Sequence, residues 1–322
     1  MIKYKVYNNN LKEWDDFIDS SINGTIFHKQ KFLEYHIERQ FSHHSLMFYK
    51  KNVLIAVFPA SIREKTLISH PGASFGGIIY RKISLSDLLD ILELIEEYAK
   101  NKKCENIEIV PPPTIYNNGD ESLIYALKWK QYTEREQYFS SIIGIQNDIN
   151  KQINEIIRNK SRSQKYYDNI MMKNNLELLW TNNFDEFYPI LRKNKERYNA
   201  QPTHTLEELN KINDLLPHAI KLLVIKKDGI AIGGNMIFIA KPNLGIIFYN
   251  MINYDYSDIQ ISTIQILESI KWGKDNKIKY LDFGISHEAG TKHPLIPKIS
   301  LIKFKEEFGG YGSLRFLFHK PI

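Results

Sequence analysis

A polar segment near the C-terminus holds the side chains with the clearest chemical potential. Residues 280–312 read YLDFGISHEAGTKHPLIPKISLIKFKEEFGGYG, an apolar strand followed by a polar loop and a second apolar piece. A strand that delivers polar side chains into a loop is a common place for a site in an α/β protein. The polar residues of this loop are Ser286, His287, Glu288, Lys292 and His293.

A carboxylate and a cation flank the loop. Lys305 could bind a phosphate or stabilise the oxyanion of an acyl transfer, or it could be an ordinary exposed helix lysine. Asp282 could orient an acceptor amine or act as a base, or it could cap the turn at Gly284. Two histidines beside one glutamate in a loop are not a spacing typical of metal ligands, so we expect no metal site.

Two further stretches could contribute to a site. His204, in the loop QPTHTLEEL, is a candidate base near neutral pH, and its alternative is a histidine packed ahead of the helix cap at Thr205. A basic run could hold a diphosphate or a lipid headgroup, although a solvated helix face is the commoner explanation. This run consists of Arg158, Lys160, Arg162 and Lys165, and it lies in a long basic stretch that we predict to be helical from Ile149 to Asn174.

Composition restricts the class of protein. A chain of 322 residues suggests two domains, and 43% hydrophobic with 25% charged residues indicates a globular protein. The single cysteine, Cys104, excludes an internal disulfide and suits a reducing cytoplasm. There is no apolar run of signal-peptide or membrane-spanning length. The net charge of +6 is compatible with phosphate-bearing ligands or contact with the inner face of a membrane.

The predicted elements occur twice in the same order. Asn52 and Asp228 lie in hairpin turns 176 residues apart, and the helical pairs Leu92-Glu93 and Leu267-Glu268 are 175 apart. The strands that begin at Ile107 and Leu281 follow 174 apart. We therefore predict a duplicated domain, with boundaries at 1–147 and 148–322. Residues 313–320 are expected to complete the sheet of the first domain.

The unit of helices, antiparallel hairpin, strand, helix and strand resembles the GNAT acyltransferase fold, and the tandem resembles the FemABX group. His70–Gly77 resembles the S-x-P-x-x-x-[YF]-G-G stretch of that group, and Asn159–Arg162 its basic helix. Asp282–Gly284 and Phe304–Gly309 resemble its D-F-G and F-K-x-x-[FW]-G signatures. The resemblance implies a mixed α/β (α+β) fold with two tandem GNAT-like domains. The stretches TIFHKQKFLEYH and QPTHTLEEL are similar to the branch encoded with surface-polysaccharide genes.

The resemblance also implies a site. The acyl group would lie between the strands at 246–254 and 279–283 of the second domain, while the first domain helps to bind the acceptor. The implied catalytic residues are Lys305, Asp282, His204 and Tyr249. The implied substrate-binding residues are Ser286, His287, Glu288, Asn250, Phe304, Gly76, Gly77 and Arg162. For the two glycines, the alternative is a need for close backbone approach.

Two departures leave the donor open between acyl-CoA and aminoacyl-tRNA. Neither 81–87 nor 254–261 contains the glycines that usually cradle the pyrophosphate of acetyl-CoA. The stretch between Phe184 and Leu223 is too short for the helical arm of many tRNA-using relatives, which disfavours tRNA. We expect a monomeric cytoplasmic N-acyltransferase that uses acetyl-CoA or another acyl-CoA, with no role for DNA. Its acceptor would be an amine of a lipid- or nucleotide-linked glycan or cell-wall precursor. The alternatives are an aminoacyl-tRNA-dependent transferase of peptidoglycan bridge formation and a catalytically inactive, glycan-binding tandem.

Overall fold

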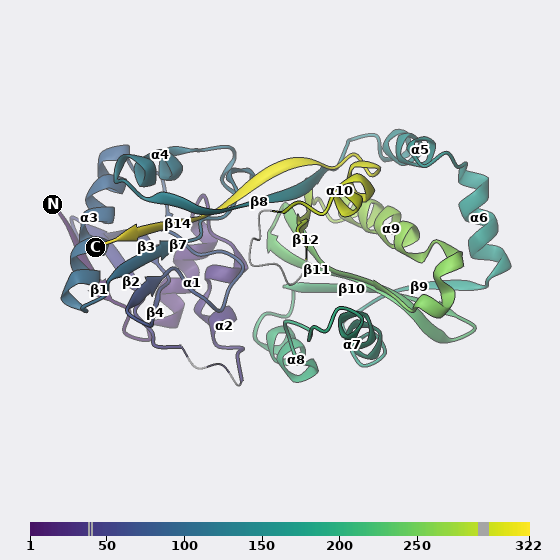
Figure 1. Cartoon of the computed structure of the whole chain (residues 1–322), viewed down its shortest axis with the longest axis horizontal. Coiled ribbons are helices and arrows are strands. Elements are labelled where there is room, and N and C mark those ends of the chain that lie inside the picture. The colour runs from purple at the N-terminus through teal and green to yellow at the C-terminus, as the bar shows by residue number, and fades with distance from the viewer. Residues whose placement is uncertain (38, 40, 289–295) are drawn as a thin grey trace. The chain divides into compact units, whose positions relative to one another are not determined.

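The chain forms two compact units. The computed structural model describes residues 1–37, 39, 41–288 and 296–322, so the predicted loop residues Lys292 and His293 lie outside the described part. Unit 1 comprises Met1–Phe139 and Ser313–Ile322, and unit 2 comprises Ser140–Gly312 (Figure 1). The sequence placed the boundary after residue 147, and the structure places it after residue 139. The reason is that residues 140–144 pair with a strand of unit 2.

Unit 1 contains one four-stranded antiparallel sheet and a second group of strands. The first has the order β1-β2-β3-β6, and the second contains β4, β5, β7 and the end of β14. The elements are β1 (Ile2–Val6), α1 (Leu11–Ser20), α2 (Gln30–Leu33), β2 (Leu46–Lys50), β3 (Val53–Phe58), β4 (Ser61–Arg63), β5 (Thr66–Ile68), β6 (Ile79–Tyr80), α3 (Leu85–Asn101), β7 (Asn106–Ile109), α4 (Ser122–Trp129) and the start of β8 (Thr133–Gly144).

Unit 2 is built on a mixed sheet with the order β8-β13-β12-β11-β10-β9, in which only β12 and β13 are parallel. Helix α9 covers one face of this sheet, and α7 and α8 cover the other (Figure 1). The elements are α5 (Ile149–Asn159), α6 (Gln164–Lys173), β9 (Leu176–Thr181), α7 (Tyr188–Glu196), α8 (Leu206–Leu215), β10 (Ile220–Lys227), β11 (Ile230–Lys241), β12 (Leu244–Ile252), the 3₁₀ segment η3 (Tyr254–Ile259), α9 (Ile261–Asp275), β13 (Tyr280–Ile285), α10 (Ile299–Glu306) and the start of β14 (Tyr311–Pro321).

Local chemistry accounts for the turns and caps that recur in the two units. Both hairpin turns, Lys51-Asn52 and Asp228-Gly229, have two successive residues with positive φ, the geometry of a type I′ turn. The cap expected at Thr205 is confirmed, and both helices begin with a capping box: Ser84 begins α3 with Asp87, and Thr205 begins α8 with Glu208. Both caps satisfy backbone N–H groups that have no partner within the helix.

The basic stretch after residue 148, predicted as one long helix from Ile149 to Asn174, is two helices. Helix α5 ends at Asn159, and Ser161 takes a left-handed conformation with φ of 53°. Ser163 then caps α6 by accepting a hydrogen bond from the Tyr166 N–H. A serine cap competes with continuation of the preceding helix, which explains why apolar periodicity alone missed the break.

In unit 1, hydrogen bonds bridge the two parallel strands β5 and β7 beyond the end of their ladder. Strands β5 and β7 pair from Thr66–Asn106 to Ile68–Glu108. Beyond them the Ser69 N–H bonds to Glu108 O, the Val110 N–H bonds to the Ser69 hydroxyl, and the Gly76 N–H bonds to Val110 O at 2.7 Å. The loop His70–Gly77 (the HPGASFGG loop) therefore occupies the backbone edge that follows the β5–β7 ladder.

The two glycines of this loop have a structural explanation. A Cβ on Gly76 would lie 1.9 Å from Ser69 O, and Gly77 has a φ of +87° with Pro111 Cα 3.2 Å from an added Cβ. Both glycines are buried. These contacts fit the alternative raised from the sequence, close backbone approach, and identify no surface for substrate at either residue.

Each unit has its own apolar core, and among the described residues no helix is long and apolar enough to cross a membrane. The final strand returns to unit 1, where its residues Phe318–Pro321 pair antiparallel with β7. This pairing gives β7 a neighbour on the side opposite β5.

We predict that Gly76→Ala will destabilise the protein by about 2 kcal/mol or more, because the new methyl group overlaps a backbone carbonyl that cannot move independently. The measurement is the free energy of unfolding in urea. The matched control is Gly144→Ala, since no atom lies within 4 Å of a Cβ at that position. Equal stability of the two variants would contradict the assignment of Gly76 to loop closure.

Candidate active site

The parallel strands of unit 2 separate where those of unit 1 are bridged. The β12–β13 ladder contains three pairs and ends at Ile246 and Asp282, although β12 continues to Ile252. A bulge follows at Phe248, because Ile247 pairs with Ile237 of β11 and Tyr249 pairs with Met236. Bulges bend a strand and redirect its side chains, often beside functional sites. We call the parts of β12 and β13 beyond this ladder the strand split.

Lys305 holds the separated end of β13. Its ammonium, on α10, donates to the carbonyl oxygens of Phe283 at 2.9 Å, Gly284 at 2.8 Å and Ile285 at 3.3 Å. It also donates to the Ser286 hydroxyl at 2.7 Å. The lysine is only 5% exposed, so these oxygens replace the hydration of its charge. Lys305 is therefore not the exposed lysine that the sequence allowed as an alternative.

The environment of Lys305 alters its acidity. Burial lowers the pKa of the ammonium to about 8, and the nearby Asp282 carboxylate acts in the opposite direction. The lysine can therefore exchange its proton within a pH range in which an exposed lysine stays charged.

Asp282 fixes the turn at the point where β13 leaves β12. Its Oδ1 accepts hydrogen bonds from the Ser140 hydroxyl at 2.7 Å and the Gly284 N–H at 2.6 Å. Gly284 has a φ of +68°, which favours glycine. The bond to Gly284 is the turn-capping role raised from the sequence, and together with the bond to Ser140 it holds the buried carboxylate in place.

Tyr249 and His204 meet on the α7–α8 face of the sheet. The buried Tyr249 hydroxyl accepts from the Thr203 N–H at 3.1 Å and shares a hydrogen bond of 3.1 Å with His204 Nδ1. Burial raises the pKa of Tyr249 to about 12. His204 is 2% exposed and packs against the rings of Phe238 and Phe248. The pair thus anchors the QPTHT loop to β12.

A series of contacts connects the α7 side of the split to Lys305. Lys298 places its ammonium 5.5 Å from the Tyr198 ring centroid, just after α7. The Lys298 N–H donates to Ser286 O at 3.1 Å, and the Ser286 hydroxyl contacts Lys305. The C-terminal end of α7 and the Lys305 cluster therefore flank the same strand split.

The other predicted site residues of unit 2 lie near the strand split and differ in how far they are buried. Asn250 follows Tyr249, and its buried Oδ1 has no hydrogen-bond partner among the described residues. Phe304 precedes Lys305 on α10 and packs against the ring of Phe308. His287 is half-buried, and burial lowers its pKa, while the exposed Glu288 lies 3.9 Å from the ammonium of Lys298.

Arg162 lies apart from these residues, in a pocket at the start of α9. The pocket has a volume of about 300 Å³ and includes Lys160, Arg162, Gln260 and Glu307. Lys160 pairs with Glu307 and faces the Phe308 ring, so Arg162 is the cation without a carboxylate partner among the described residues. Its guanidinium stacks on Tyr166 at 5.0 Å.

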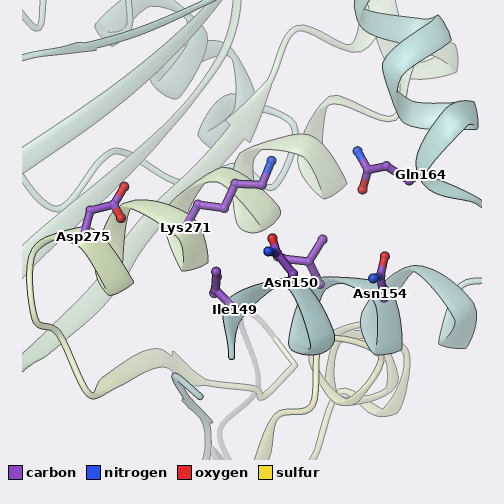
Figure 2. A pocket seen from close by; sticks show the side chains of 7 residues that line it. Ile149, Asn150, Asn154, Gln164, Lys271 and Asp275 are labelled. Carbon is purple, nitrogen blue, oxygen red and sulfur yellow. The ribbon is translucent and has the colours of Figure 1, made fainter. Parts of the chain in front are cut away.

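A second pocket contains none of the predicted site residues. Its volume is about 460 Å³, and it lies between α5, the start of α6 and α9. Figure 2 shows Lys271 and Asp275 projecting from α9, with Asn150 and Asn154 on α5 and Gln164 on α6. Its polar side chains are exposed, so it is a surface pocket separate from the strand split.

The sequence did not identify Ser140, Lys195 or Lys298 as neighbours of the site. Ser140 reaches Asp282 across 142 positions of the chain, so no local pattern could link them. Lys195 and Lys298 lie in segments with unremarkable charge patterns. Among the described residues no group of three histidine, cysteine, aspartate or glutamate side chains could hold a metal ion.

Comparison with known proteins identifies the fold. No protein-family model matches the chain, and no curated protein matches it significantly. The structure of FemX aligns with a TM-score of 0.72 and 14% identity over 99% of this chain and 97% of that chain. A tandem GNAT protein from the clavulanic acid biosynthesis pathway aligns with a TM-score of 0.56 and 6% identity, covering 100% and 98%.

A third similar structure is the C-terminal domain of a protein described as a lysylphosphatidylglycerol synthetase from Agrobacterium fabrum. Its TM-score is 0.60 at 9% identity, covering 96% of this chain and 91% of that domain. At sequence identities this low, the similarity concerns the fold alone. The predicted FemABX-like tandem GNAT fold, with mixed α/β architecture, is confirmed.

We predict that Lys305→Met will lower the free energy of unfolding by about 2 kcal/mol or more at pH 7, because it leaves buried carbonyl oxygens without a donor. Urea denaturation followed by tryptophan fluorescence measures this change. Lys303→Met is the control, since Lys303 lies on the same helix and is exposed. A loss no larger than that of the control would show that the Lys305 hydrogen bonds do not hold β13.

The stability difference between wild type and Lys305→Met should also depend on pH. The folded-state pKa of about 8 lies below the ordinary value of lysine, so the unfolded chain retains the Lys305 proton at higher pH than the folded chain does. The stability of wild type relative to the variant should therefore increase above pH 8, by up to about 1.4 kcal/mol per pH unit. Parallel denaturation curves between pH 7 and 10 test this expectation, and a constant difference contradicts it.

Proposed function

We propose that the protein is an N-acyltransferase that moves an acyl group from acyl-CoA to an amine of a cell-surface glycan or cell-wall precursor. The main observation that supports this proposal is the strand split. Strands β12 and β13 separate after Ile246 and Asp282, and Lys305 donates hydrogen bonds to the carbonyl oxygens of β13 beyond that point. The resemblance to the GNAT-like fold implies that the acyl chain lies at this split. Backbone groups at an open strand edge can bond an extended ligand as an added strand does.

The residues at the split suit acyl transfer. The reaction needs hydrogen-bond donors directed at the developing oxyanion and a path for the proton released by the amine. Because the Ser286 hydroxyl accepts from Lys305 Nζ, its own proton is available to donate, and the adjacent positive charge strengthens that donation. We assign Ser286, whose side chain is buried beside Lys305, as the oxyanion donor, with Lys305 and Asp282 as the residues that position it.

Tyr249 and His204 serve the acceptor side in this proposal. Their hydrogen bond fixes the loop before α8 against β12, on the face covered by α7 and α8. A fixed loop can orient an amine toward the split, and orientation alone can supply several kcal/mol of the rate enhancement. Asn250, His287 and Glu288 then border the bound substrates, while Phe304 supports α10 by packing against Phe308.

The pocket at the start of α9 suits the phosphates of the donor. The start of a helix favours anions, and Arg162 adds a guanidinium there. The connection before α9 lacks the glycines of the usual acetyl-CoA signature, so Arg162 would supply the charge that binds the phosphates, because Lys160 is paired with Glu307. An acceptor of the proposed kind, a lipid- or nucleotide-linked glycan, would allow the enzyme to act at the inner face of a membrane.

Unit 1 supports a division of labour between the two units. The HPGASFGG loop bridges the edge after the β5–β7 ladder, so unit 1 has no counterpart of the strand split among its described residues. We therefore place donor binding and chemistry in unit 2 and a contribution to acceptor binding in unit 1.

An aminoacyl donor is the second candidate, because FemX aligns with a TM-score of 0.72 and another similar structure is described as a lysylphosphatidylglycerol synthetase. Aminoacyl-tRNA would bring a large polyanion, so its binding should weaken steeply with salt. Acyl-CoA carries only a few phosphates and should show a shallower dependence.

The test is release of free thiol from acetyl-CoA in the presence of UDP-linked amino sugars, followed with a thiol reagent. We expect turnover in wild type and a reduction in kcat of about 100-fold in Ser286→Ala, because one oxyanion donor is lost. Ser86→Ala, an exposed position in unit 1, is the control.

Aminoacyl transfer from charged tRNA, with no thiol release from any acyl-CoA, would replace the acyl-CoA proposal by the second candidate. Absence of turnover and of binding with both kinds of donor would instead favour an inactive, glycan-binding tandem. Full activity of Ser286→Ala would show that Ser286 is not the oxyanion donor. The assays with acyl-CoA and with charged tRNA would still identify the donor.

A further inference from the structure

Lys195, in the last turn of α7, is a half-buried cation with no anionic partner in the described ranges of the chain. Burial lowers its pKa, and no neighbouring carboxylate opposes the shift. Among the described residues no carboxylate lies within ion-pair distance of its ammonium. By contrast, the little-exposed side chains of Lys160, Lys226 and Lys320 each pair with a glutamate. Since a buried charge without a partner is costly, its presence calls for an explanation.

The immediate surroundings offer only partial compensation. The Lys195 ammonium lies 5.6 Å from the centroid of the Tyr249 ring, and cation–π attraction of this kind is modest. The Tyr249 hydroxyl is already bonded to Thr203 and His204, and Tyr188, on the same helix, donates to His204 O at 3.3 Å. The neighbouring polar groups thus bond to one another and leave the ammonium available.

Lys195 also stands beside the strand split. Tyr249 lies three residues past Ile246, the last residue of β12 that pairs with β13. One turn beyond Lys195, Tyr198 contacts Lys298, whose N–H bonds to Ser286 O beside Lys305. Two lysines with lowered pKa values therefore flank the split, one from α7 and one from α10. Lys305 has four oxygen partners, and Lys195 has none among the residues that the structure describes.

We propose that Lys195 binds a carboxylate or phosphate group of the amine acceptor beside the strand split. This inference rests on the proposed function. The acceptor is favoured over the donor because Lys195 lies on the face covered by α7 and α8, whereas the pocket with Arg162 lies at the start of α9 on the other face. An ammonium is a compact charge with three donors, which suits either anion.

The first consequence concerns stability. If Lys195 is kept for a ligand, its removal should not destabilise the ligand-free protein, since an unpaired charge leaves a half-buried site. We expect Lys195→Gln to melt at or above the temperature of wild type. A clear decrease in melting temperature would assign Lys195 a structural role and overturn the inference.

The second experiment detects anion binding without an activity assay. Lysines are reductively methylated with ¹³C-formaldehyde, and the Lys195 signal is assigned by its absence in Lys195→Gln. Titration with inorganic phosphate and, separately, with acetate should shift this signal saturably and raise the pKa of Lys195. The relative affinities distinguish a phosphate site from a carboxylate site. No saturable shift with either anion would overturn the inference.

The control is Lys193, which lies two residues earlier on α7, is exposed and approaches Asp255 at 3.4 Å. Its methyl signals should respond to neither anion beyond the general effect of salt. An equal response of Lys193 and Lys195 would indicate nonspecific charge screening and count against a site at Lys195.

With an active donor and acceptor, Lys195→Gln should raise the acceptor KM by about 10- to 100-fold, as expected for loss of a hydrogen bond to a charged group. The kcat and the donor KM should change little, and Lys195→Arg should recover part of the affinity. An unchanged acceptor KM in an active enzyme would overturn this inference alone. Saturable anion binding at Lys195 in a protein that transfers no acyl group would overturn the proposed function and leave the anion site standing.

Discussion

The hydrogen bonds of one buried ammonium determine the shape of the site. When two parallel strands separate, the freed backbone carbonyls need donors, because a buried carbonyl without a partner costs free energy. Lys305 meets this need for three successive residues of β13 and also contacts Ser286. The strand can therefore leave β12 without a ladder on that side. The positive charge that stabilises the open strand edge is thus placed where an acyl group would need electrostatic help.

The two units show how one fold can be bridged beyond its parallel ladder in one copy and left without that bridge in the other. Both contain a hairpin with a type I′ turn, a long helix after the central strands and a parallel strand pair. In unit 1 the Ser69 hydroxyl and the Gly76 N–H complete the edge beyond that pair. In unit 2 a bulge at Phe248 and the ammonium of Lys305 keep the edge apart. The difference depends on a few polar contacts after the ladder rather than on a different order of elements.

Much of the fold could be predicted because its signals are local. The turn at Asp228-Gly229, the capping boxes at Ser84 and Thr205 and the apolar faces of α3 and α9 depend on residues within a few positions of one another. The prediction failed where a local signal competed with periodicity, as at Ser161 and Ser163 between α5 and α6. It had no basis for Ser140, whose partner Asp282 comes from a distant part of the chain.

The sequence by itself determined the kinds of elements, their duplicated order and the residue types able to serve acyl transfer, because these follow from spacing along the chain. Only the tertiary structure decided the partners of each side chain. It paired Tyr249 with His204, gave Lys305 four oxygen partners and, within the described part of the chain, left Lys195 without a carboxylate. Burial and hydrogen bonding depend on distances between residues far apart in the chain, and these distances set the acidity and the availability of each group.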